Sequence, residues 1–372
     1  MLPLLAAPAR FTVRFRTMGE RSIVAAVTGA TGHVGGALVR ALLERGHRVR
    51  ALVRGDTRTL EGLDVERVRG DLGEAASLER AFAGADVVVH AAAYISLLRT
   101  DTRLVDAVNV AGTAAVLAAC RASGVRRLVH FSSIHSLEQR PLDRPVDEDR
   151  PLCDERPARG LPPYDRSKAA AERLVREAAG AGLDAVILNP TGMFGPFDFK
   201  PSLFGRVLTA LAGGRLPAIV DGGFDWVDVR DVAASAATAA EQLAAGRGRN
   251  GAGARRYLLP GRWASLAEVA ALVADSTGVP APRWAAPLWA ARAGAPFSTA
   301  AALVLRHRPL FTGVSLAALG NNRRVSGGRA AADLGHAPRD LRESVADTLR
   351  WFTDHGMIVP HGPTPGRERS SP

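Results

Sequence analysis

Tyr164 and Lys168 are the two residues whose types and spacing could do chemistry. They belong to the stretch Tyr164-Asp165-Arg166-Ser167-Lys168, and side chains four apart on a helix share one face, with Cβ atoms about 5–6 Å apart. An ammonium at that distance lowers the pKa of a phenol from about 10, so that the phenol can exchange a proton near neutral pH. Taken alone, the pattern is more often a solvated helix face. Its interpretation therefore depends on the elements that position it.

Those elements are buried strands that alternate with amphipathic helices. Strands are expected at residues 23–27, 47–53, 65–69, 86–90, 127–131 and 184–188, and helices at 34–45, 75–82, 104–123 and 164–178. This alternation predicts an α/β fold with a Rossmann-type, doubly wound parallel sheet over residues 22–190.

The second half of the chain is less regular. Helices are expected at residues 202–211, 229–243, 266–277, 288–307 and 341–352. Residues 191–355 are expected to form a smaller, mixed C-terminal substrate-binding lobe, from which strands or helices can return to the first domain. Its aromatic side chains are expected to be core more often than pocket: Phe194, Phe197, Phe199, Phe204, Phe224 and Trp226. Residues 1–21 and 356–372 are expected to be a disordered extension and a flexible tail.

A glycine-rich turn joins the first strand to the first helix. It reads Thr28-Gly29-Ala30-Thr31-Gly32-His33-Val34-Gly35. Glycines at these positions allow a tight turn, a close backbone approach and close helix packing, and the helix N-terminus offers amide donors to a pyrophosphate. The turn predicts a dinucleotide site formed by Gly29, Thr31, Gly32, His33, Val34 and Gly35.

The end of the second strand indicates which dinucleotide binds. An acidic residue there accepts a hydrogen bond from a free ribose 2′-hydroxyl, whereas an arginine can pair with a 2′-phosphate. Because Arg54 ends the strand and Arg58 is nearby, NADP(H) is favoured. NAD(H) stays an alternative, since Asp56 could play the acidic part.

Polar or small residues also follow the next strands. Asp71-Leu72 follows the third strand, Ala91-Ala92-Ala93 the fourth, and Ser132-Ser133 the fifth. Ligands of open parallel sheets bind at the carboxyl ends of the strands. These residues and the helix that carries Tyr164 are therefore expected to face one crevice.

The composition is that of a soluble globular protein, with 372 residues, 47% apolar and 23% charged. The net charge of +11 comes from scattered arginines without a long run of like charge, so nucleic acid is not expected as a partner. No transmembrane helix is expected, because the longest stretch free of charged residues is rich in glycine. The two cysteines offer neither a disulfide framework nor a metal site, which fits a cytoplasmic protein without a bound metal.

Six motifs in this order resemble the extended short-chain dehydrogenase/reductases, the NAD-dependent epimerase/dehydratase family. They are residues 28–35, Gly70-Asp71-Leu72, Asn109-Val110-Ala111-Gly112-Thr113, Ser132-Ser133, Tyr164–Lys168 and the segment 189–196. The resemblance covers about residues 22 to 352. Phe131-Ser132-Ser133-Ile134-His135 before an acidic, proline-rich loop is most similar to the dihydroflavonol-reductase-like and 3β-hydroxysteroid-dehydrogenase-like members.

The resemblance implies roles for individual residues. Tyr164 would be the catalytic acid/base, Lys168 would bind the nicotinamide ribose and hold the tyrosine pKa down, and Ser133 would hydrogen-bond the substrate oxygen. Asn109 would support the site from the helix after the fourth strand. Asp71 and Leu72 would flank the adenine, with Pro190 and Thr191 near the nicotinamide. A homodimer through the helices at 104–123 and 167–178 is implied as well.

One segment of the second half is also similar to the family. Asp225-Trp226-Val227-Asp228-Val229-Arg230-Asp231-Val232 resembles its return to the sheet, with Asp231 expected to cap a helix.

Three functions fit these observations. The leading one is an NADP(H)-dependent reductase or dehydrogenase that acts on the ketone or alcohol of a hydrophobic small molecule. The second is a nucleotide-sugar epimerase or dehydratase. Leu137-Glu138 stands against it, because the sugar-nucleotide epimerases have Tyr-Gly there, and the Thr-Asp/Glu pair of the dehydratases is also missing. The third is a module that senses NADPH without turnover.

Overall fold

The computed structural model of the protein describes residues 21–96, 98–155, 160–247, 253–295 and 312–358. The expected N-terminal extension except Arg21, most of the expected tail and residues 296–307 of one expected helix lie outside these ranges. Residues 288–295 at the start of that helix are helical.

A sheet of seven parallel strands forms the centre of the larger lobe, in the order β10-β6-β5-β4-β1-β2-β3. The strands are β1 Val24–Thr28, β2 Arg48–Val53, β3 Glu66–Arg69, β4 Val87–His90, β5 Arg127–Phe131, β6 Asp184–Pro190 and β10 Arg255–Leu259. The strand order reverses between β1 and β4, which opens a crevice at their carboxyl ends. The prediction of a Rossmann-type parallel sheet is confirmed.

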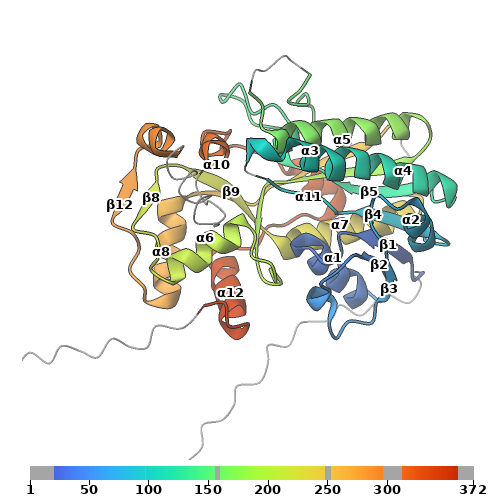
Figure 1. Ribbon diagram of the computed structural model, residues 1–372, viewed down its shortest axis with the longest axis horizontal. Helices are drawn as coiled ribbons and strands as arrows, with labels where there is room; N and C mark the ends of the chain where they lie inside the picture. Colours follow the sequence, from blue (N-terminus) through green and yellow to red (C-terminus); the bar gives the residue numbers. More distant parts are fainter. Residues whose placement is uncertain (1–20, 97, 156–159, 248–252, 296–311, 359–372) are drawn as a thin grey trace, which may run out of the picture.

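Helices cover both faces of this sheet (Figure 1). One face carries α1 His33–Glu44, α7 Val229–Ala244 and α11 Gly328–Leu334, and the other carries α2 Ala75–Phe82, α4 Gly112–Ala122 and α5 Pro163–Gly180. The chain thus returns to the sheet after the first six strands, because α7 packs on α1 and β10 pairs with β6.

The smaller lobe contains two short sheets and several helices. The strands are β7 Gly192–Phe194, β9 Gly223–Asp228 and β11 Arg262–Ser265 in one sheet, and β8 Ala218–Val220 and β12 Trp284–Ala286 in the other. The helices are α6 Leu203–Ala212, α8 Leu266–Thr277, α10 Gly313–Ala318 and α12 Leu341–Asp354. The rings of Phe194, Phe204, Phe224 and Trp226 pack on one another in the core of this lobe.

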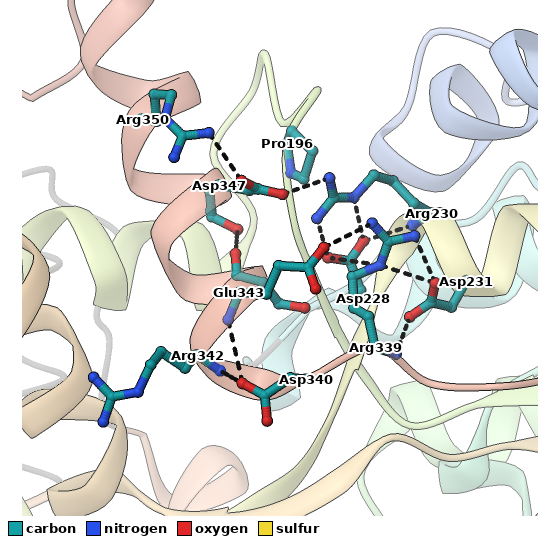
Figure 2. Close-up of polar contacts among 12 residues, drawn as sticks. Pro196, Asp228, Arg230, Asp231, Arg339, Asp340, Arg342, Glu343, Asp347 and Arg350 are labelled. Carbon is teal, nitrogen blue, oxygen red and sulfur yellow. Dashed lines mark hydrogen bonds and ion pairs between the residues drawn. The ribbon is translucent and has the colours of Figure 1, made fainter. Parts of the chain in front are cut away.

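A network of charged side chains fastens α12 to the start of α7 (Figure 2). Asp228 is the N-cap of α7 and accepts a hydrogen bond from the backbone N–H of Arg230 at 2.8 Å. Asp231 instead lies in the first turn and pairs with Arg339 at 2.7 Å. The expectation that Asp231 caps the helix is therefore wrong, because the helix begins at Val229 and Asp228 is its N-cap. Arg230 also reaches Asp347 of α12 at 2.8 Å.

The stretch expected as one helix after the fourth strand has three parts. The turn η2 Arg99–Asp101 leads into α3 Thr102–Val105, the π-helical segment η3 Asp106–Ala111 and then α4. By length and composition alone, Thr102–Ala122 could cross a membrane, although 44% of its most apolar window is buried within the protein. It packs against α2 and α5 as a core helix does.

Candidate active site

The glycine-rich turn has a backbone that side chains would disrupt. Gly29 has φ +73°, and a Cβ on it would lie 2.5 Å from the amide nitrogen of Ala92, after β4. A Cβ on Gly35 would collide with the carbonyl oxygen of Gly29. The amide of Gly32 closes the turn by donating to Gly29 at 2.9 Å, and α1 begins at His33. A tight, glycine-rich turn ahead of a helix N-terminus fits a dinucleotide pyrophosphate.

The other residues expected around this turn surround it. Thr31 accepts a hydrogen bond from Thr59 at 3.1 Å through its carbonyl, and Val34 packs against the core. The amide of Ala91 donates to Thr28 at 3.1 Å, which continues the sheet toward Ala92 and Ala93.

Arg54 and Asp71 meet at the ends of β2 and β3. The Arg54 guanidinium donates to the Asp71 carboxylate at 3.1 Å and is 80% exposed. Both line an open hollow of about 460 Å³. Asp71 also accepts from the amide of Gly73, and this hydrogen bond is the main cause that lowers the pKa of its carboxyl. Leu72 turns inward and packs over Gly112, where a Cβ would lie 2.8 Å from it.

Tyr164, Ser133 and Lys168 come together at the carboxyl end of β5. The nearby Ser133 side chain acts to lower the pKa of the Tyr164 phenol, but burial outweighs it and raises the pKa of Tyr164 to about 12. The Lys168 ammonium donates to the Phe131 carbonyl at 2.7 Å, and burial lowers its pKa to about 8. The structure thus corrects the expectation that Lys168 lowers the tyrosine pKa. The ammonium points at the strand end, and desolvation of the phenol prevails.

His135 closes the site beside Tyr164. The two rings meet edge to face with centroids 6.2 Å apart, and the imidazole Nδ1 lies 3.5 Å from the Asp165 carboxylate. Burial works to lower the pKa of His135, but Asp165 outweighs it and the pKa is raised. Asp165 therefore favours a cationic imidazolium next to the phenol.

Asn109 supports the site without touching its reactive groups. It lies in η3, and its amide group donates to the Ser167 hydroxyl at 2.9 Å and to the Tyr94 carbonyl at 3.0 Å. Ser167 in turn donates to the backbone carbonyl of Tyr164 at 2.7 Å. Asn109 thus joins the loop after β4 to the first turn of α5.

A buried carboxylate that the sequence interpretation missed holds the Ser133 loop in place. Glu172 lies one turn after Lys168 and is fully buried. It accepts hydrogen bonds from Ser132 at 2.7 Å, Ser136 at 2.9 Å and Asn189 at 3.0 Å, and from Arg256 of β10 at 2.8 Å. Burial favours a raised pKa, but Arg256 and these donors hold the pKa of Glu172 below its ordinary value. The repeat of Tyr164, Lys168 and Glu172 every four residues was the available signal.

Pro190 ends β6, and Thr191 follows it. The Thr191 hydroxyl donates to Asp225 at 2.6 Å, and the amide of Gly261 donates to the same carboxylate oxygen at 2.7 Å. Burial raises the pKa of Asp225. This carboxylate therefore joins the end of β6 to β9 of the smaller lobe.

Two neutral histidines lie under the site between the sheet and α4. His90 bridges the hydroxyls of Thr28 at 2.7 Å and Thr113 at 3.1 Å, and its ring lies 5.4 Å from that of His130. Burial, with the nearby Lys168 charge, lowers the pKa of His90 to about 3 and that of His130 well below its usual value. The layer below Lys168 is thus uncharged at neutral pH.

These features define an NAD(P)-dependent oxidoreductase of the extended short-chain dehydrogenase/reductase type. Residues 25–251 match the NAD dependent epimerase/dehydratase family, and the chain belongs to this family.

Several relatives match nearly the whole chain. Sterol demethylase protein B of Methylococcus capsulatus is 38% identical over 336 residues, which cover 89% of this chain and 99% of the relative. A putative dihydroflavonol 4-reductase of Synechocystis is 33% identical, over 89% of this chain and 95% of the relative. The fold is similar to that of PA4631, a nucleoside-diphosphate-sugar epimerase from Pseudomonas aeruginosa. Its TM-score is 0.73 at 27% identity, over 91% of this chain and 99% of that one.

Proposed function

We propose that the protein is an NADP(H)-dependent reductase that converts a ketone of a hydrophobic, ring-containing small molecule to an alcohol, with Tyr164 as the acid. The observation that carries the proposal is the position of the Tyr164 phenol next to the Ser133 side chain, at the carboxyl end of β5. Both side chains lie where open parallel sheets bind their ligands, and Lys168 follows one helical turn later.

Each residue has a distinct part in this mechanism. When bound, the nicotinamide supplies or accepts a hydride. Ser133 donates a hydrogen bond to the substrate oxygen and Tyr164 donates its proton there as negative charge develops. A phenol with a pKa of about 12 is protonated at neutral pH, which is the form needed for reduction. Lys168 stands beside Tyr164 with an ammonium that can turn from Phe131 toward ribose hydroxyls.

The preference for NADP(H) is supported by Arg54 at the end of β2. Its exposed guanidinium borders the hollow at the ends of β2 and β3, and a guanidinium can bind a phosphate through two hydrogen bonds. The proposed substrate class is supported by the two relatives, whose names refer to a sterol and a dihydroflavonol. Both are ring-containing molecules with a hydroxyl or carbonyl group.

The test compares Tyr164→Phe with a matched variant. The chain has three tyrosines, and Tyr257→Phe is the control because Tyr257 lies in β10, where its hydroxyl donates to Asp333 at 3.0 Å. NADPH oxidation is followed with a ketosteroid and a dihydroflavonol as probes. Tyr164→Phe should lower kcat by about 10²–10⁴-fold, the usual contribution of a general acid, and keep the Kd for NADP+. Equal turnover in the two variants would overturn the assignment.

Two further outcomes separate the alternatives. Tightly retained NAD together with turnover of a UDP-sugar would favour an epimerase or dehydratase. Absence of turnover over a broad panel, with a partner that binds only in the presence of NADPH, would favour a sensing module.

A further inference from the structure

Residues 195–200, which we call the strap, connect β7 to the segment before α6 and contact the nucleotide-binding lobe. The carbonyl of Pro196 lies 3.0 Å from the His33 imidazole, at the start of α1. The Arg40 guanidinium lies 4.5 Å above the Phe197 ring. Phe197 has φ +69°, a left-handed conformation that is rare for an aromatic residue. The strap thus keeps an unfavourable backbone while it lies against the helix that follows the phosphate-binding turn.

The far end of the strap is anchored in the smaller lobe. The Phe199 ring packs edge to face on Trp351 of α12, with centroids 5.0 Å apart. Asp198 is 2% exposed and accepts the amide of Ser202 at 2.8 Å. These contacts leave Lys200 beside the loop that follows β2.

Lys200 faces a carboxylate that already has a cation. Its ammonium lies 3.6 Å from Asp56, whose two oxygens accept hydrogen bonds from Arg58 at 2.9 and 3.1 Å. The Arg58 and Lys200 side chains are 58% and 54% exposed. Ion pairs between exposed groups contribute little to stability, so folding alone does not account for two cations at this place.

The residue type at position 200 is also unusual for this chain. Of 48 lysines and arginines, only Lys168 and Lys200 are lysines. Lys168 stands next to Tyr164 in the candidate active site. Lysine supplies a compact point charge on a flexible stem, whereas arginine supplies a planar fork. A lysine in the strap therefore suits contact with a single phosphate oxygen.

We propose that Lys200 and Arg58 bind the 2′-phosphate of NADP(H), and that Asp56 holds the two cations when no phosphate is present. The inference rests on the proposed use of NADP(H) and assigns part of the cofactor specificity to a residue of the smaller lobe. A phosphate with about two negative charges displaces the Asp56 carboxylate from the cations, whereas a ribose with a free hydroxyl leaves that carboxylate in place.

The first test uses the two lysines directly. The protein is acylated with succinimidyl acetate in the presence of 2′,5′-ADP or 5′-AMP, and modification of Lys200 is measured by peptide mass spectrometry. Lys168 is 4% exposed and serves as the internal reference. Protection of Lys200 by 2′,5′-ADP and not by 5′-AMP is expected. Equal protection by both nucleotides, or by neither, overturns the proposal.

The second test measures the Kd of both nucleotides by calorimetry. Lys200→Met should weaken 2′,5′-ADP binding about tenfold, equivalent to about 1.4 kcal/mol, and leave 5′-AMP unchanged. The control is Arg342→Met, which removes a cation that is 64% exposed and paired with Asp275. Asp56→Asn should strengthen 2′,5′-ADP binding. Weaker 5′-AMP binding in that variant would make Asp56 a ribose ligand and overturn the proposal.

The tests distinguish failure of the proposed preference for NADP(H) from failure of the proposed role of Lys200. If the wild-type protein binds 2′,5′-ADP no more tightly than 5′-AMP, the preference for NADP(H) is wrong and the inference fails with it. If the wild-type protein prefers 2′,5′-ADP and Lys200→Met keeps that preference, only the role of Lys200 is wrong.

Discussion

Replacement of Glu172 by glutamine should be among the most costly changes of a single atom in the site. One carboxylate oxygen accepts from Ser132, Ser136 and Asn189, and the other accepts from Arg256. A glutamine side chain has the same shape but only one acceptor oxygen, because its other end is an NH₂ donor. In either orientation, donors therefore face donors in a region without solvent.

The expected loss in the free energy of unfolding follows from the burial of both Glu172 and Arg256. Glu172 is fully buried and Arg256 is 3% exposed, and loss of one partner from a buried ion pair costs about 3–5 kcal/mol. That is a large part of the roughly 5–15 kcal/mol that holds a folded protein together. The matched control is Asp275→Asn, which removes a carboxylate that is 57% exposed and paired with Arg342. A pair at the surface is worth about 0–1 kcal/mol.

Urea unfolding of the wild type, Glu172→Gln and Asp275→Asn at neutral pH measures these differences in the free energy of unfolding. The lowered pKa of Glu172 also fixes a pH dependence. The carboxylate contributes stability above its unfolded pKa of about 4.5, and this contribution is lost as the pH falls through the lower folded value. The wild type should therefore lose more stability than Glu172→Gln between pH 5 and the acid limit. A loss below about 1 kcal/mol in Glu172→Gln, as for an exposed pair, would refute this reasoning.

Three further changes test other parts of the structure. Gly29→Ala should weaken NADP+ binding by at least about tenfold by calorimetry, because its Cβ would lie 2.5 Å from the Ala92 amide; unchanged binding would show that the turn does not hold the cofactor. Asn109→Ala should lower kcat with little change in the Kd for NADP+, since it supports Tyr164 only through other residues; a change in Kd alone would contradict this. Arg339→Met should lower the free energy of unfolding by about 1–3 kcal/mol in urea, because Asp231 would lose a partner at 2.7 Å; stability equal to the wild type would contradict it.

Most of the central sheet could be predicted from the sequence because buried parallel strands appear as short apolar runs. β1 and β4 are such runs, and they lie within one residue of the expected ranges. β10 escaped prediction because it begins Arg255-Arg256, which is typical of a surface segment. The reason for a buried arginine is Glu172, 84 positions away, and local periodicity cannot show such a partner.

The short strands of the smaller lobe were missed for a related reason. β7, β8 and β12 have three residues each, too few for an alternating pattern to stand out. They exist because distant segments pair, as β12 does with β8 in parallel. Pairing between segments far apart in the sequence determines these strands, because the residues themselves have little preference for the extended state.

In the candidate site too, contacts with distant segments cannot be predicted from the local sequence. Helical spacing brings Tyr164, Lys168 and Glu172 to one face of α5, and this much follows from the sequence. What each side chain meets depends on the strand ends opposite that face. Tyr164 meets Ser133, Lys168 meets a carbonyl, and Glu172 meets Arg256. Burial, which the Asp165 charge reinforces, raises the pKa of the phenol more than the Ser133 side chain lowers it. A phenol that stays protonated at neutral pH is in the form that donates a proton, which is the form that the proposed reduction of a ketone needs.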